Sequence, residues 1–283
     1  MSILAWNCRG LCNPTAIRVL ADLVCSKRPK VIFLMETFVD RRKMEGIRVQ
    51  IGYDNVFTVG AVGHRGGLAF LWMNTVVLEI TGYSTNHIDT KLALDIDKPQ
   101  FRFTGYYGFP ERHRRREAWN MLRSLAAQSS LPWVTMGDYN DLLHQFDKRG
   151  RLPHPDWLLT GFRETVEDCG LHEFLFEGHK FTWEHSRGIE NMVEEKLDRI
   201  FTTESWLTIF DGARATSALC PYSDHLPIIL TPETLERRSN RKRFCFDNVW
   251  LREEKCREIV TQSWERTMGL DVFTRIEYCG NDI

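Results

Sequence analysis

The sequence lacks several features that would place it in a specialised class of protein. Its 283 residues contain no apolar run close to the roughly 20 residues that a membrane-spanning helix needs. The N-terminal segment, residues 1 to 6, has no basic stretch ahead of its apolar residues, so we expect neither a signal peptide nor a transmembrane segment. No internal repeat and no low-complexity tract is present. These absences favour an intracellular globular protein that has no membrane partner.

The cysteines show no metal-binding pattern. None of the eight forms a Cys-x-x-Cys pair, and their spacing matches no zinc site. A disulfide framework is the alternative. Reduced and mostly buried thiols in an intracellular protein are the favoured interpretation.

The chain also has almost no net charge, because 37 Lys and Arg residues face 38 Asp and Glu residues for a net charge of −1. This balance argues against a protein that coats nucleic acid by charge alone. The basic residues are clustered at 41–43, 112–116 and 237–243. Each cluster is compatible with a phosphate-facing surface or with an ordinary solvated surface. The third is also compatible with a localisation signal or a basic linker.

What is present predicts an α/β domain followed by a tail. Short apolar runs of strand length at 3–6 and 31–35 flank a segment, 16–24, whose apolar residues have helical spacing. Such a strand-helix-strand opening favours an α/β domain. Further strands are predicted at 55–59, 67–73, 76–83, 91–96 and 101–107, as a run of antiparallel hairpins. Helices at 111–129 and 155–169 follow, with strands at 133–136, 180–183, 197–201, 213–219 and 226–230.

The pattern changes after Pro232. Residues 233–243 are polar and basic, which is typical of a linker, and 248–268 have the spacing of an amphipathic helix. We therefore predict one domain over residues 1–231, and a basic linker with a helical tail over residues 232–283.

Polar residues that suit metal and phosphate binding stand at the ends of the apolar strands. Asn7 follows the first strand, and Glu36 follows the second. The others are Tyr107, Asp138, Asn140, Asp198, Asp224 and His225. Taken singly, each is equally well explained as a turn or capping residue. Together they predict a site, because α/β enzymes assemble their sites from strand ends that meet at one edge of a sheet.

Six segments in this order resemble the endonuclease/exonuclease/phosphatase superfamily. They are WNCRG (6–10), LMET (34–37), GYYG (105–108), GDYN (137–140), LDRI (197–200) and SDHLPI (223–228). GDYN and SDHLPI are the more specific of them. The resemblance implies a four-layer α/β sandwich, in which two packed, mixed and mainly antiparallel sheets are flanked by helices. Here the linker and tail helix would follow it.

Within that superfamily, the chain looks most like the endonuclease domain of plant LINE-type (non-LTR) retrotransposons. HRGGLAFLW (64–72), HKFTW (179–183) and KLDRIF (196–201) carry this likeness. The tail, FCFDNVWLREEKCREIVTQSW (244–264), resembles the segment that leads to a reverse transcriptase. No Tyr-x-Asp-Asp motif is present, so the resemblance implies a fragment, a truncated copy or a domesticated remnant.

The resemblance also implies roles for the strand-end residues. Glu36, Asn7 and Asp224 would hold Mg²⁺, with Mn²⁺ as a possible substitute. Asp138 would orient or activate the attacking water. His225, fixed by Asp198, would stabilise charge on the scissile phosphate.

Three further residues would contact the substrate. Tyr107 and Asn140 would bind phosphate oxygens, and Arg9 stands two residues after Asn7, where abasic-site endonucleases often have an acid. Trp183 is interpreted as a core residue. The arginine at position 9 argues against close kinship with those enzymes, without arguing against catalysis.

The function implied is a magnesium-dependent DNA endonuclease that nicks DNA to leave 3′-hydroxyl and 5′-phosphate ends. DNA is the expected partner, no obligate protein partner is expected, and nuclear action is implied by the family. A phosphatase or phosphodiesterase acting on a lipid or small molecule is the alternative within the same superfamily. A catalytically inactive remnant is the alternative outside the enzymes.

Overall fold

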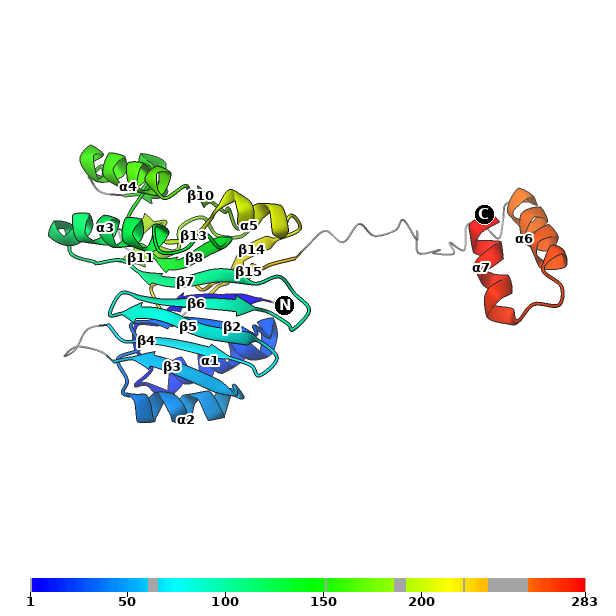
Figure 1. The fold of residues 1–283 in the computed structure, drawn as a ribbon, viewed down its shortest axis with the longest axis horizontal. Helices are drawn as coiled ribbons and strands as arrows, with labels where there is room; N and C mark the ends of the chain where they lie inside the picture. The colour runs from blue at the N-terminus through cyan, green and yellow to red at the C-terminus, as the bar shows by residue number, and fades with distance from the viewer. Residues whose placement is uncertain are drawn as a thin grey trace. The chain divides into compact units, whose positions relative to one another are not determined.

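The computed structural model describes residues 2–60, 66–150, 152–185, 192–220, 222–233 and 254–282. The chain divides into two compact units, Met1–Leu235 and Glu236–Ile283. The first unit contains two six-stranded sheets, with helices on the outer face of each (Figure 1). This arrangement confirms the predicted four-layer α/β sandwich.

The first sheet contains the two strands that open the sequence. β1 and β2 run parallel, as the predicted strand-helix-strand opening requires, and the other neighbours are antiparallel. In sheet order the strands are β14 (Arg214–Ser217), β15 (Ile228–Thr231), β1 (Ile3–Asn7), β2 (Val31–Met35), β4 (Leu68–Trp72) and β3 (Asn55–Val59).

The second sheet has the same plan, with one parallel pair, β7 and β8, among antiparallel neighbours. In sheet order its strands are β10 (His172–Glu173), β13 (Asp198–Thr202), β8 (Trp133–Asp138), β7 (Phe101–Tyr107), β6 (His87–Ala93) and β5 (Val77–Ser84). The predicted run of hairpins is therefore divided between the sheets, because β3 and β4 pair in the first sheet and β5 to β7 in the second.

Alternation along the strands builds three apolar layers. Phe33 and Met35 of β2 face the second sheet, where they join Phe103 and Met136 in the central core. The alternate residues of the first sheet pack against α1 (Pro14–Lys27) and α2 (Arg41–Ile51). The outer face of the second sheet packs against α3 (Arg115–Ala126) and α4 (Asp156–Asp168). Because successive side chains of a strand point to opposite faces, two buried faces give the near-continuous apolar runs seen in the sequence.

Several elements escaped prediction or were placed wrongly. Helix α2 has mostly polar residues and buries only Met44, Ile47 and Ile51, so the basic cluster at 41–43 is its first turn. The short helix α5 (Glu204–Ile209) was also missed, as were β12 (Val193–Glu195) and β9 (Lys148–Arg149) of a small three-stranded sheet. The third strand of that sheet, β11 (Trp183–His185), begins at the last residue of the strand predicted over 180–183. Strand β6 starts at residue 87 and not at 91, because its pairing with β7 begins there. These strands are set by pairing partners, which a local pattern does not contain.

The described residues of the second unit form two helices, α6 (Glu254–Arg266) and α7 (Val272–Asp282). The predicted helix over 248–268 is therefore shorter at its C-terminal end, and α7 was not predicted. The predicted linker over residues 233–243 lies almost entirely outside the described residues, as does the start of that helix.

Two chain-wide expectations bear on the environment of the protein. The seven cysteines within the described ranges are all free, and four of them are buried. No helix of the described ranges is both long and apolar enough to cross a bilayer.

Candidate active site

The predicted residues of the two sheets meet where the parallel strand pairs end. Asn7 ends β1 and Glu36 follows β2, while Tyr107 and Asp138 end β7 and β8 and stand opposite each other in register. The Asn7 side chain joins the two sheets, since its Nδ2 donates to Glu36 Oε1 at 2.9 Å and to Asp138 Oδ2 at 3.0 Å. An amide nitrogen carries two hydrogens, so it can make both bonds at once.

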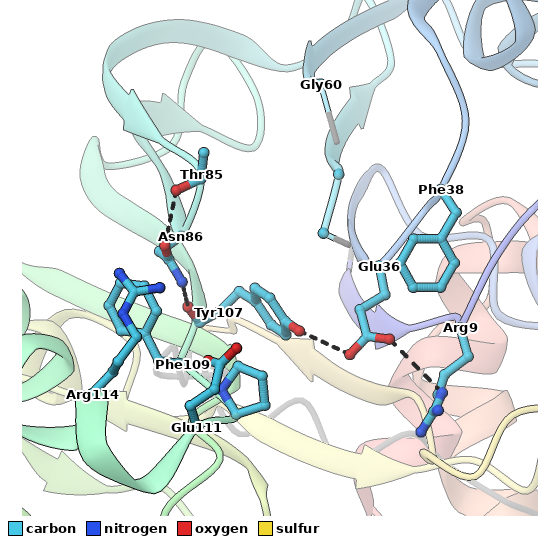
Figure 2. Close-up of a pocket in the computed structure, with 13 residues that line it drawn as sticks. Arg9, Glu36, Phe38, Gly60, Thr85, Asn86, Tyr107, Phe109, Glu111 and Arg114 are labelled. Atoms are coloured by element: carbon cyan, nitrogen blue, oxygen red, sulfur yellow. Dashed lines mark hydrogen bonds and ion pairs between the residues drawn. The ribbon is translucent and has the colours of Figure 1, made fainter. Parts of the chain in front are cut away.

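Glu36 is fixed from a second side by Tyr107. The Tyr107 hydroxyl donates to Glu36 Oε1 at 2.9 Å (Figure 2). Burial, reinforced by the Glu36 carboxylate, raises the pKa of Tyr107, so the hydroxyl keeps its proton and acts as a donor. The second carboxylate oxygen of Glu36, Oε2, lies 3.8 Å from Arg9 Nε.

Asn140 donates hydrogen bonds to both carboxylate oxygens of Asp138. Its backbone N–H donates to Asp138 Oδ1 at 2.9 Å, and its Nδ2 donates to Asp138 Oδ2 at 3.1 Å and to the Gly108 carbonyl at 3.1 Å. The left-handed backbone of Asn140, with φ 55°, folds the chain back in this way. In GDYN, Gly137 and Asp138 thus end strand β8, and the bend at Asn140 positions a carboxylate.

His225 lies between two carboxylates. Its Nδ1 is 2.8 Å from Asp198 Oδ2, and its Nε2 is 3.8 Å from Asp138 Oδ2. Asp198 and Asp138 stand opposite each other because β13 and β8 pair antiparallel. Burial alone would lower the pKa of His225, but Asp198 and then Asp138 outweigh burial and raise it to about 9. The two carboxylates therefore favour the protonated, cationic form of the imidazole. Burial raises the pKa of Asp138, and the charge on His225 opposes part of that rise.

Asp224 links Arg9 to a residue from the small sheet. Its Oδ2 accepts a hydrogen bond from Arg9 Nη1 at 2.6 Å and one from Trp183 Nε1 at 3.0 Å. Trp183, interpreted as a core residue, is half-buried and packs against the apolar cluster of Leu142, Leu159 and Leu197, and its indole N–H also bonds to a site carboxylate.

Backbone strain is concentrated at this edge of the sheets. Five non-glycine residues of the described ranges have positive φ: Arg9, Arg28, Glu36, Phe38 and Asn140. Arg28 ends α1 in the usual left-handed cap. The other four are site residues or their neighbours. Such conformations cost about 1–3 kcal/mol each and persist at functional sites, where the surrounding structure enforces them.

The chain matches a known protein family over most of its length. Residues 4–225 match the model of the Endonuclease/Exonuclease/phosphatase family. The chain belongs to this family. The predicted superfamily is thereby confirmed, and every predicted site residue lies within the matched range. The family is one of phosphate-ester hydrolases, so the chain has the fold of a hydrolytic enzyme.

Solved structures with the same fold include several nucleases. The endonuclease domain of TRAS1, described as a telomere-specific non-LTR retrotransposon, superposes with a TM-score of 0.62 at 19% identity, covering 83% of this chain and 99% of that one. An AP endonuclease from Archaeoglobus fulgidus gives 0.61 at 16% identity, covering 83% and 100%. A 3′-5′ exonuclease from Neisseria meningitidis gives the same values. No curated protein sequence matches significantly.

Two groups of family residues were considered as metal ligands. Asp138, Asp198 and His225 offer ligand atoms within 4.8 Å of one another. Two of the three, His225 and Asp198, already hydrogen-bond each other at 2.8 Å. On the other side, Glu36, Asn7 and Asp224 offer only oxygen, and Asp224 Oδ1 is buried with no hydrogen-bond partner among the described residues. Hard oxygen ligands suit Mg²⁺, so the residues of this second group fit the predicted ion.

Several supporting residues were missed by the sequence reasoning. Ser223 Oγ donates to the Asn7 carbonyl at 2.8 Å and accepts from the His225 backbone N–H at 3.0 Å, tying two site strands together. Asp141 is buried behind Asn140 and accepts from Trp119 Nε1 at 3.0 Å. Ser223 stands within the SDHLPI motif, two residues before His225, but its other partner, Asn7, is 216 residues away in the sequence.

Proposed function

We propose that the chain is a magnesium-dependent DNA endonuclease that hydrolyses phosphodiester bonds to leave 3′-hydroxyl and 5′-phosphate ends. The observation that carries this proposal is the convergence of Glu36, Asp138 and His225 at one edge of the two sheets, through the contacts that Asn7 and Asp198 make. A carboxylate for a metal, a second carboxylate for water and a cationic imidazole for phosphate are the groups that this hydrolysis needs.

Glu36, Asn7 and Asp224 would hold the Mg²⁺, or Mn²⁺ in its place. When bound there, the ion would supply a Lewis acid to a phosphate oxygen and to the leaving 3′ oxygen. The chain's own contribution is to fix Glu36. Asn7 and Tyr107 both donate to its Oε1, so Oε2 is the carboxylate oxygen that neither of them uses and that would face the ion.

Asp138 and His225 would act directly on the reacting groups. Asp138 is buried with a raised pKa, which makes its carboxylate a stronger base toward a water proton than an exposed aspartate. His225 would place its positive charge beside the developing charge on the phosphate, in a site where burial strengthens the attraction. Asp198 would keep the ring oriented and charged.

Tyr107, Asn140 and Arg9 were predicted to contact substrate. Their hydrogen bonds in the structure go to Glu36, Asp138 and Asp224 respectively, so we propose that positioning these carboxylates is part of their role. Arg9 is half-exposed and would also contact a phosphate oxygen of the substrate.

DNA as the substrate and descent from a LINE-type element rest on two supports. The first is the set of retrotransposon-like segments in the sequence, and the second is the fold shared with the TRAS1 endonuclease domain. Action in the nucleus without an obligate protein partner belongs to the same proposal.

Nicking of supercoiled plasmid tests the proposal. Wild-type protein with Mg²⁺ is expected to convert the plasmid to open circles, and EDTA is expected to stop the reaction. Glu36→Gln and His225→Ala should lower the nicking rate by about 10²-fold or more, because the first removes a carboxylate that would hold the metal and the second removes the cation beside the phosphate. The matched controls are Glu45→Gln and His113→Ala, which make comparable changes at exposed positions.

The ends of the nick give a second readout. DNA ligase should reseal the open circles without prior kinase treatment, because ligase joins 3′-hydroxyl to 5′-phosphate ends. If the plasmid stays intact under all conditions although the protein is folded, the proposed DNA endonuclease activity is refuted. Phosphorylated lipids and small molecules would then be the next substrates to test. Only if none of them is hydrolysed would the chain be regarded as an inactive remnant.

A further inference from the structure

The site opens into a pocket that extends well beyond the residues used by the proposed reaction. Its volume is about 750 Å³, and its lining runs from Arg9, Glu36 and Phe38 to Tyr107, Phe109 and Arg114 (Figure 2). Pockets of about 300–1,000 Å³ hold ligands of nucleotide size. A group bound here would lie directly beside a phosphate held at Glu36.

We propose that this pocket binds the nucleotide next to the scissile phosphate, with Arg114 contacting the phosphate on the far side of that nucleotide and Phe38 contacting its base. The proposal rests on the proposed function and extends it. It names a substrate feature, a nucleoside flanked by two phosphates, that a lipid or a simple phosphomonoester lacks.

Among the described lining residues, the cationic groups lie at the two ends of the pocket. Arg9 is beside Glu36, and Arg114 is beside Phe109 on the opposite side of Tyr107 (Figure 2). Glu111 also lines the pocket, so its charge is not uniformly positive. Two separate guanidinium groups match an anion at each end better than they match one anion in the middle.

Arg114 is held ready for this contact. Its guanidinium carbon lies 3.6 Å from the centre of the Phe109 ring, and its Nε and Nη2 donate to Glu117 at 2.9 and 2.6 Å. Because the stack and the two bonds restrict the side chain before any ligand arrives, binding costs less conformational entropy than it would with a free arginine. Of the basic cluster at 112–116, Arg114 is the member that lines the pocket.

The pocket wall behind Arg114 is fixed by a buried ion pair. Arg115, only 6% exposed, donates to the carbonyls of Phe109 and Pro110 and lies 3.5 Å from Asp141. Asp141 follows Asn140 directly in the chain, so the same turn that positions Asp138 also anchors the pocket wall.

Phe38 stands on the other side of the pocket. Its backbone has φ 50°, and its N–H donates to the Gly66 carbonyl at 3.4 Å. A Cβ on Gly10 would lie 3.1 Å from the Phe38 ring, so the glycine leaves room for the ring. The half-buried ring provides a surface on which a base of any identity can stack.

Calorimetric binding of thymidine 3′,5′-bisphosphate tests the proposal, since this probe carries one nucleoside between two phosphates. It is compared with thymidine 5′-monophosphate and with deoxyribose 3′,5′-bisphosphate, which lacks the base, each in Mg²⁺ and in EDTA. Wild-type protein should bind the thymidine bisphosphate about tenfold more tightly than the base-free bisphosphate. It should also prefer the bisphosphate over the monophosphate.

Two variants separate the contacts. Arg114→Gln should remove the preference for two phosphates and keep the preference for a base, whereas Phe38→Ala should do the reverse. Arg116→Gln, an exposed neighbour on α3, is the charge control. Glu117→Gln removes the partner of Arg114 and keeps the guanidinium, so it should keep the preference for two phosphates.

Several outcomes would overturn the proposal. The first is an equal loss of affinity for all three probes in Arg114→Gln. The second is loss of the preference for two phosphates in Glu117→Gln as well as in Arg114→Gln. The third is binding of inositol 1,4-bisphosphate as tight as that of the thymidine bisphosphate. If the protein nicks plasmid but shows none of these binding preferences, the proposed role of the pocket is refuted and the proposed endonuclease activity stands. If it shows the preferences but does not nick plasmid, the endonuclease activity is refuted and the role of the pocket stands.

Discussion

Asp198 illustrates how one buried side chain sets the chemistry of another. Its carboxylate is 2.8 Å from His225 Nδ1 and is the largest influence that raises the His225 pKa, against a burial that would lower it. A cationic imidazole can stabilise a phosphate, whereas a neutral one cannot do so by charge. The proposed activity should therefore depend on Asp198, even though Asp198 need not touch the substrate.

Asp198→Asn keeps the hydrogen-bonding shape and removes the charge. We expect kcat to fall by about a hundredfold. The wild-type rate should fall as pH rises through about 9, where His225 loses its proton. In the variant the pKa of His225 falls, because the main favourable charge is gone, so the alkaline limb should move to lower pH. A pH–rate profile measures both effects.

Asp22→Asn makes the same chemical change on the exposed face of α1 and serves as the control. A lower kcat with an unmoved alkaline limb would mean that Asp198 acts only through packing.

At the scale of single residues, the strand-end positions of the site were predictable. Asn7, Glu36 and Asp138 each follow a continuous apolar run, and an isolated polar residue there requires a partner. Their bonding was not predictable, because the partners are far apart in sequence. Asn7 and Asp138, for example, are 131 residues apart.

At the scale of elements, β8 carries the geometry of the site. Gly137, next to Asp138, has φ 149°, and a Cβ there would lie 2.0 Å from the Tyr106 carbonyl oxygen and 3.2 Å from Met35 Sδ. The strand therefore runs between β7 and β13 closely enough to bring Tyr107, Asp138 and Asp198 into register.

Gly137→Ala should force β8 away from β7. We expect the free energy of unfolding to fall by about 3 kcal/mol, since the clash is with backbone that cannot move aside. Nicking should also fall, because Asp138 shifts relative to Asn7. Urea unfolding followed by circular dichroism measures the loss of stability.

Gly46→Ala is the matched control, because a Cβ at that exposed position of α2 meets nothing within 4 Å. It should raise the free energy of unfolding by about 0.5–1 kcal/mol, as alanine favours a helix more than glycine does. Equal effects of the two substitutions would contradict the packing argument.

Elements also differed in how well the sequence predicted them. Strands β1, β2, β7 and β8 are buried on both faces, and β1 and β2 appear as nearly continuous apolar runs, whereas β7 also buries Arg102 and Thr104. Helix α2 was missed because its polar face dominates its composition, although Asp40 caps it by accepting from the Lys43 N–H at 2.7 Å.

At the scale of the whole molecule, the three apolar layers all belong to the first unit. Its last described contacts involve Glu233, whose carbonyl accepts from the Gly212 N–H at 3.0 Å and whose carboxylate lies 3.6 Å from Arg214. The predicted domain boundary after residue 231 would remove this residue, whereas the compact unit extends to Leu235.

A protein cut after Leu235 should fold and nick plasmid as the full chain does, because its core and site are internal to the first unit. Its melting temperature should stay within about 2 °C of the corresponding transition of the full chain. Differential scanning calorimetry of both proteins, together with the plasmid assay, provides the comparison. A fragment that melts much lower or loses activity would show that residues 236–283 contribute to the first unit.

The sequence by itself determined the α/β class, the buried strands, the family motifs and the identities of the candidate site residues, because these follow from local apolar patterns and from short ordered segments. Only the tertiary structure decided which partners each site residue has, that Trp183 joins the site, and that Arg114 and Phe38 face one pocket beside Glu36. The physical reason is that hydrogen bonds, buried charges and pocket walls depend on strand pairing and sheet packing between residues far apart in the chain, and no local pattern contains that information.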